Sequence, residues 1–213
     1  RVTGRCRHAP LHDELAHIRE RPGEERRGSR RARSAMEAAQ ALLRSEGYYQ
    51  PVLEDDVEGE ETPVAVITVT PGRRFVLGET KVNWIAPVPD AVTEQTVIKD
   101  LALKPGDPGR AAEVLAAEGR IVAGLTREGY ADARAEPRRV VVDHADFTVQ
   151  PNFNIASGAL VRLDGVLVRT RGPTNPEWVA GLAPWSAGDR YDPEDVAELE
   201  RRLLDTGVYE GVG

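Results

Sequence analysis

Four side chains near the start of the sequence belong to the types that bind transition metals: Cys6, His8, His12 and His17. Imidazole and thiolate are common zinc ligands, and two histidines four residues apart would lie on one face of a helix. Pro10 lies between His8 and His12 and opposes a regular helix, and no second cluster completes a ligand set. This favours a chance grouping, and we expect no metal and no cofactor.

A second group of reactive residue types surrounds position 144. His144 lies between Asp143 and Asp146, and Ser157 precedes Gly158. A serine nucleophile is usually presented on a sharp turn with a Gly-x-Ser-x-Gly pattern, and no such pattern accompanies these residues. We therefore expect His144 to be a turn residue and the protein not to be an enzyme.

Phosphate and nucleic-acid binding are no better supported. The stretch 104–110 (KPGDPGR) lacks the Gly-x-x-x-x-Gly-Lys-Ser/Thr order of a phosphate loop. Residues 1–34 hold ten arginines and five acids, so the net charge of -7 divides into about +5 there and about -12 elsewhere. No aromatic residues alternate with these arginines, as base stacking requires. We expect a solvated terminal segment and no nucleic-acid partner.

The overall composition limits the kinds of fold that the chain can form. Only 5% of the 213 residues are aromatic and the mean hydropathy is -0.42, which indicates small aliphatic cores. Cys6 is the one cysteine, so an internal disulfide is excluded. No run of 18 apolar residues suggests a membrane-spanning helix.

The elements that would position any functional group are repeated along the chain. The segments at 45–49 (SEGYY), 127–130 (REGY) and 205–209 (DTGVY) align on a glycine. Leucine stands four residues before each glycine, and another aliphatic residue stands eight before: Ala39, Leu43, Gly47; Ile121, Leu125, Gly129; Leu199, Leu203, Gly207. This spacing predicts an amphipathic helix that ends at a glycine, three times over.

Other landmarks recur at nearly the same spacing. They are Leu101, Gly106 and Asp107, which recur as Leu182, Gly188 and Asp189, and Leu77 with Val82, which recur as Leu163 with Val168. A unit of about 80 residues is longer than a solenoid repeat and predicts small domains, each with its own core. We place these modules at 1–72, 73–152 and 153–213.

The second module gives the architecture. Residues 74–84 (RFVLGETKVNW) alternate as a strand, and residues 92–103 carry helical apolar spacing at Val92, Val97, Ile98 and Leu101. The stretch 104–110 interrupts the helix, a second helix runs to Gly129, and two strands follow, joined by a turn around 143–146. The fold class is α+β, with strand-helix-helix-strand-strand modules whose two helices cover a three-stranded mixed sheet.

Helix starts are predicted from capping patterns. Asp107 before Pro108 and Asp192 before Pro193 each combine an N-cap residue with a first-turn proline. Thr174 three residues before Glu177 forms a capping-box pattern. We therefore expect the two helices of the third module to start there, with Val196, Leu199 and Leu203 on the apolar face of the second.

This repeated unit, with a Gly-Tyr pair after its second helix and a glycine in its first strand (FVLGETKV, 75–82), resembles the POTRA (polypeptide-transport-associated) domain. The segments EGYADARAE (128–136), VRLDGVLV (161–168) and GDRYDPEDVAELERRLLDTGVY (188–209) most resemble the outer-membrane subunit of the translocation and assembly module. The resemblance implies a periplasmic arm of a Gram-negative outer-membrane protein, with a barrel beyond Gly213.

Two modules depart from this pattern. Residues 1–30 contain no alternating apolar run, so the first module is expected to have an incomplete or atypical first strand, or to start with a helix around 13–21. The third stops where its closing hairpin should begin, and we expect its helices to lack part of their sheet.

The resemblance implies that the strand after each Gly-Tyr lies at a sheet edge, where it can accept an extended peptide as an added strand. We expect these acceptors at 48–53 and 130–136, with nine candidate contacts: Tyr48, Tyr49, Gln50, Val52, Tyr130, Ala131, Asp132, Ala133 and Arg134. The partners would be client outer-membrane polypeptides or an inner-membrane-anchored subunit. Alternatively, the alternating Asp132, Arg134 and Glu136 block pairing, and the modules act as a spacer.

Aromatic residues are expected in structural roles. A tyrosine just beyond a helix-ending glycine usually packs back on the last turn, which applies to Tyr48, Tyr130 and Tyr209. The three tryptophans at 84, 178 and 185 are expected in cores or between modules.

Overall fold

The computed structural model describes residues 2–3, 25–58, 64–169 and 174–208. The chain forms two compact units: the first combines 1–80, 103–115 and 140–151, and the second combines 81–102, 116–139 and 152–213. The division passes through the second sheet, so these units differ from the three expected modules. The module boundaries at 72/73 and 152/153 therefore stay a prediction.

The first sheet has three strands in the order β1-β3-β2. The central strand β3 (Val64–Thr70) pairs in parallel with β1 (Val2–Thr3) and antiparallel with β2 (Val52–Glu58). The first module thus has a first strand, but one of only two residues. β1 spans two residues, which is too short to show an alternating pattern. The helix expected at 13–21 lies outside the described residues.

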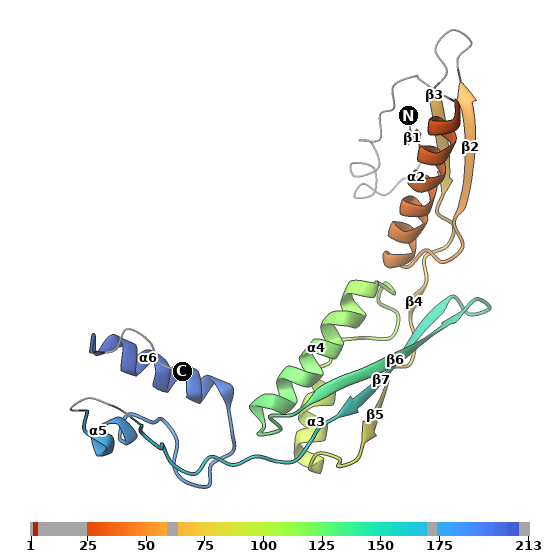
Figure 1. Cartoon of the computed structure of the whole chain (residues 1–213). Coiled ribbons are helices and arrows are strands. Elements are labelled where there is room, and N and C mark those ends of the chain that lie inside the picture. The colour runs from red at the N-terminus through yellow and green to blue at the C-terminus, as the bar shows by residue number, and fades with distance from the viewer. Residues whose placement is uncertain (1, 4–24, 59–63, 170–173, 209–213) are drawn as a thin grey trace. The chain divides into compact units, whose positions relative to one another are not determined.

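The helix α2 (Glu25–Ser45) covers this sheet (Figure 1). Leu43, the residue four before the glycine, is 1% exposed and packs with Ile67 and Val69 of β3. Tyr48 packs against the same cluster, as expected for an aromatic after the helix-ending glycine. The apolar row on α2 and the alternating residues of β3 therefore build the core of the first module.

The second sheet has β7 (Thr148–Ala156) at its centre. β7 pairs in parallel with β4 (Val76–Leu77) and β5 (Lys81–Ile85), and it also pairs with β6 (Arg134–Asp143). The turn between β6 and β7 lies at 144–147, close to its expected place. The strand expected at 74–84 is therefore two strands.

The break between β4 and β5 is a bulge. Leu77 pairs with Val149 and Lys81 pairs with Asn152. The chain therefore advances four residues from β4 to β5 while β7 advances three. The buried Pro151 lies in this interval. Proline has no N–H to donate and is tolerated within a sheet at such irregularities.

Two helices, α3 (Ala91–Lys99) and α4 (Ala111–Arg127), lie on one face of the second sheet (Figure 1). In α4, Ala117, Ile121 and Leu125 are all 0% exposed, which is the expected four-residue spacing. Every second residue of β7 is buried, among them Phe153 and Ile155. The expected α+β module, with helices on a mixed sheet, is confirmed.

The first helix of this module is shorter than expected. α3 ends at Lys99, and Asp90 caps its start by accepting from the N–H groups of Val92 and Thr93. Val97 is buried as expected on the apolar face, but Val92 is 74% exposed. The inward residue of the first turn is Thr93, at 1% exposure.

The expected start of α4 is also wrong. The helix begins at Ala111 rather than after Asp107, because residues before it bond to the first strand. The Asp107 carbonyl accepts from Leu77 N–H, and Gly109 N–H donates to the Phe75 carbonyl. These bonds hold 107–109 in a non-helical conformation despite the Asp-Pro pattern.

The third module contains α5 (Pro176–Ala180) and α6 (Pro193–Asp205). Asp192 caps α6 as expected, but the cap of α5 is Asn175 and not Thr174, since the Asn175 side chain accepts from the N–H groups of Glu177 and Trp178. Val179, Leu199 and Leu203 form its core. None of the described helices is long and apolar enough to cross a membrane.

Candidate functional site

β6 is an outer strand of the second sheet. Among the described residues it pairs only with β7. None of its ten residues is buried, and Val140 and Val141 are 39% and 37% exposed. β6 therefore presents one row of backbone donors and acceptors that its own sheet does not use.

Charged residues and a proline limit further strand pairing along β6. Arg134 forms an ion pair with Glu136 (2.9 Å), and Arg138 forms one with Glu118 of α4 (2.6 Å). Pro137 has no N–H, and its carbonyl accepts from the Asn154 side chain (2.7 Å). Charges and proline are common devices against uncontrolled edge pairing.

β2 is the corresponding outer strand of the first sheet. It pairs only with β3 among the described residues. Val52 at its start is 55% exposed, and the carboxylates Glu54, Asp55 and Asp56 follow on exposed positions. The β2 edge is thus acidic, whereas arginines dominate the first half of β6.

The two edges begin later than expected. β2 starts at Val52 and β6 at Arg134, so only two of the nine expected contact residues lie on a strand. The other seven precede the strands: Tyr48, Tyr49, Gln50, Tyr130, Ala131, Asp132 and Ala133.

The cause is the geometry of the helix end. Tyr48 N–H donates to the Leu43 carbonyl and Tyr130 N–H donates to the Leu125 carbonyl, which closes each helix in a Schellman motif. Gly47 and Gly129 adopt φ of 93° and 96° to allow it. The chain thus uses several residues to leave the helix before a strand can form.

Tyr49 and Gln50 contact the second module instead. The rings of Tyr49, His144 and Phe147 each stand edge-on to Phe75, with centroids 5.2 to 5.4 Å away. The Gln50 amide donates to His144 Nδ1 (2.9 Å). Burial raises the pKa of the Tyr49 phenol. His144 is a turn residue, as expected, and it also forms part of the first junction.

One backbone hydrogen bond crosses this junction, and three more fix the first strand of the second module to the loop before α4. They are Phe75 N–H to Gly47 O (2.8 Å), Gly109 N–H to Phe75 O (3.0 Å), Leu77 N–H to Asp107 O (2.7 Å) and Gly106 N–H to Leu77 O (2.8 Å). The Glu46 carboxylate adds ion pairs with Arg74 (3.0 Å) and Arg110 (3.2 Å).

The second junction repeats the same four backbone bonds. They are Val161 N–H to Gly129 O (2.8 Å), Tyr191 N–H to Val161 O (3.1 Å), Leu163 N–H to Asp189 O (2.8 Å) and Gly188 N–H to Leu163 O (2.7 Å). The paired positions are the landmarks of the sequence repeat, such as Leu77 with Leu163 and Asp107 with Asp189. The repeat therefore encodes the joint as well as the helices.

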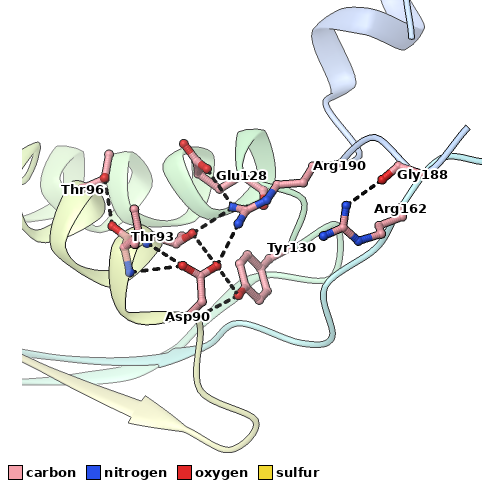
Figure 2. A network of polar contacts seen from close by, with 9 residues as sticks. Asp90, Thr93, Thr96, Glu128, Tyr130, Arg162, Gly188 and Arg190 are labelled. Carbon is pink, nitrogen blue, oxygen red and sulfur yellow. Dashed lines mark hydrogen bonds and ion pairs between the residues drawn. The ribbon is translucent and has the colours of Figure 1, made fainter. Parts of the chain in front are cut away.

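Side chains add a polar network to the second junction (Figure 2). Arg190 of the third module donates to Asp90 Oδ2 (3.3 Å), Thr93 Oγ1 (3.2 Å) and Glu128 Oε2 (3.1 Å). The Tyr130 hydroxyl accepts from Asp90 N–H (2.8 Å) and donates to the Asp90 carboxylate (3.2 Å). One arginine thus connects the third module to the caps of both helices of the second.

The electrostatics of Asp90 follow from these contacts. The Thr93 N–H bond is the largest cause that lowers the pKa of Asp90, with further contributions from the Thr93 and Tyr130 hydroxyls and the Arg190 charge. The carboxylate is therefore held ionised, as an N-cap that also binds an arginine should be.

Sequence reasoning missed this network. Asp90 and Arg190 are 100 positions apart, and no spacing in the sequence links them. The available signal was the glutamate before the first two helix-ending glycines: Glu46 and Glu128 both accept an arginine of the following module.

The remaining aromatic expectations have mixed outcomes. Trp84 is half-buried and donates to Glu94 Oε1 (2.8 Å), and Trp185 packs against the third core. Trp178 is 47% exposed, so it does not lie in a core, which was one of the two places expected for it. Tyr209 lies outside the described residues, as do Cys6, His8, His12 and His17. The part of the chain that is described contains no group of three or more metal-ligating side chains.

No family model matches the chain. Among solved structures, it is similar to the third to fifth POTRA domains of BamA from Haemophilus influenzae, with 18% identity, a TM-score of 0.51, and coverage of 100% of this chain and 86% of that chain. It is also similar to BamA from Haemophilus ducreyi lacking POTRA domains 1–3, with 21% identity, a TM-score of 0.53, and coverage of 65% of this chain and 25% of that chain. The chain has the fold of tandem POTRA domains.

Proposed function

We propose that this chain is a polypeptide-binding arm that accepts extended segments as added strands at its sheet edges. The observation that carries the proposal is β6, a ten-residue outer strand with no buried residue and one unused row of backbone groups. Main-chain hydrogen bonds are nearly independent of sequence, which suits a receptor for many unfolded segments. The acceptor in the first module is β2.

The fold and the sequence resemblance support a proposed location and proposed partners for the arm. POTRA domains occur in BamA, and we place this chain in the periplasm as part of an outer-membrane protein with a barrel. The partners are client outer-membrane polypeptides or an inner-membrane-anchored subunit. Within this group, the sequence segments favour the outer-membrane subunit of the translocation and assembly module.

The charges along β6 fit a transient binder. Arg134 at the start of β6 and Arg138 near its middle both form ion pairs. Pro137 lacks the backbone N–H that another residue would offer to an added strand. An added strand must align between these obstacles, which limits the length of the pairing. Short pairing favours rapid release over stable aggregation.

A spacer function is the second candidate, and the junctions favour it. The same four backbone bonds at both junctions, with arginine ion pairs beside each, fix the start of each following module to the preceding helix end. Such joints suit an arm that sets a distance between a barrel and an inner-membrane partner without binding clients.

Backbone-methylated peptides separate the two functions. A labelled ten-residue peptide of alternating threonine and valine is titrated into the chain, alongside two versions N-methylated on either set of alternate residues. Strand addition uses one row of peptide N–H groups, so one methylated version should bind at least about tenfold more weakly and the other nearly unchanged. Equal binding of all three would contradict strand addition, and absence of binding would favour the spacer.

A further inference from the structure

Pro137 divides the β6 edge into two unequal parts. It has no N–H to donate to an added strand, and its carbonyl already accepts from the Asn154 side chain (2.7 Å). Three residues of β6 precede Pro137 and six follow it. The longer uninterrupted row of outward backbone donors and acceptors therefore lies in 138–143, and an added strand is expected to pair there.

The side chains of this part alternate between the two faces of the sheet. The Arg138 guanidinium binds Glu118 of α4 (2.6 Å), so Arg138 lies on the face that carries the helices. Successive strand residues point to opposite faces, which places Arg139 and Val141 on the other face. Both are exposed, Val141 at 37%. Alternate side chains of a strand added beside β6 would lie next to this pair.

Arg139 carries a charge that no described residue neutralises by contact. Arg134 and Arg138 form ion pairs, whereas Arg139 forms neither an ion pair nor a hydrogen bond through its side chain within the described residues. Asp143, the acid on the same face of β6, accepts from two backbone N–H groups of the turn that follows. A carboxylate on an added strand would therefore have Arg139 as its counter-charge.

We propose that β6 selects extended segments that carry a carboxylate side chain beside Arg139 and an aliphatic side chain two positions away, beside Val141. This inference rests on the proposed strand addition at β6 and specifies which segments bind there. Opposite charges at neighbouring positions of paired strands stabilise the pairing, and for an exposed pair the gain corresponds to about two- to fivefold in affinity. The selectivity is modest, as suits a receptor for many segments.

The probes are three versions of the alternating threonine-valine peptide, with one central valine replaced by glutamate, glutamine or lysine. Each is titrated into the full chain and into two variants that lose the same charge from the same strand. Arg139→Gln removes the proposed partner, and Arg134→Gln removes an arginine that lies before Pro137 and already pairs with Glu136. Amide exchange locates the bound peptide, and circular dichroism checks that the variants are folded.

We expect the glutamate peptide to bind the wild-type chain about two- to fivefold more tightly than the glutamine peptide at low salt, and the lysine peptide to bind more weakly than both. This preference should disappear in Arg139→Gln, persist in Arg134→Gln and shrink in about 1 M salt. The bound peptide should slow exchange within 138–143 and leave 134–136 unchanged.

Several results would overturn the proposal. Equal binding of the three peptides to the wild-type chain would remove the selectivity and leave strand addition standing, and so would a preference that survives Arg139→Gln or that Arg134→Gln abolishes equally. Slowed exchange at 134–136 would contradict the confinement to 138–143. Binding of none of the peptides would contradict strand addition itself. Self-association of the chain that Arg139→Gln abolishes in sedimentation would assign Arg139 to a contact between copies.

Discussion

Gly129 follows the end of α4, its carbonyl accepts the hydrogen bond from Val161 N–H of the third module, and its backbone has a positive φ. Gly129→Ala tests all three features. Its φ of 96° disfavours any residue with a Cβ, at about 1 to 2 kcal/mol. A Cβ built there would lie 2.8 Å from Leu160 Cδ1, 3.2 Å from the Val161 carbonyl oxygen and 3.3 Å from Arg190 Cβ. Overpacking of this kind adds about 1 to 3 kcal/mol. The expected loss of unfolding free energy is about 2 to 5 kcal/mol.

The matched control is Gly119→Ala in α4, the helix that Gly129 terminates. Gly119 lies inside α4, and a Cβ there meets nothing within 4 Å. Alanine should stabilise that position by about 0.5 to 1 kcal/mol. Urea unfolding followed by helical circular dichroism and tryptophan fluorescence measures both variants. Equal stability of Gly129→Ala and the wild type would refute the close approach of the third module to this helix end.

Three further predictions concern the network of the second junction. Arg190→Gln should lower the unfolding free energy by about 1 kcal/mol at low salt and by less in about 1 M salt, because the ion pairs of Arg190 are partly exposed. Urea titrations measure both losses, and equal losses at the two salt concentrations would count against a role for these ion pairs. The pKa of Asp90 is lowered by folding from 3.8, so its contribution to stability is complete above that value and is lost as the pH falls through the folded pKa. Asp90→Asn should therefore flatten the pH dependence of the urea midpoint below about pH 4, and an unchanged slope would contradict the assignment. Tyr130→Phe leaves Asp90 N–H without its hydroxyl acceptor and should cost about 1 kcal/mol by the same assay, whereas no loss would show that solvent replaces the hydroxyl.

The helix ends and the module type were predictable because they depend on local patterns. Leucine and glycine at fixed spacing identify both the buried row and the residue that closes the helix, and Gly47 and Gly129 do so here. The Asp192–Pro193 start was predictable for the same reason. These features need no knowledge of distant parts of the chain.

The errors arose where distant segments override a local pattern. β1 is recognisable only through its pairing with Ile67 and Thr68 of β3. Asp107 fails as a cap because Leu77 N–H takes its carbonyl. The edge strands start late because the Schellman turn and Tyr130 use the residues after the glycine. Arg190 joins the site through contacts that no spacing within the sequence indicates.

The most direct test of the central claim is residue-resolved amide exchange of the full chain with and without the alternating threonine-valine peptide. Strand addition predicts slower exchange at alternate residues of β6, since only one row of its N–H groups faces outward. Unchanged exchange along β6 while the peptide is bound would contradict the account.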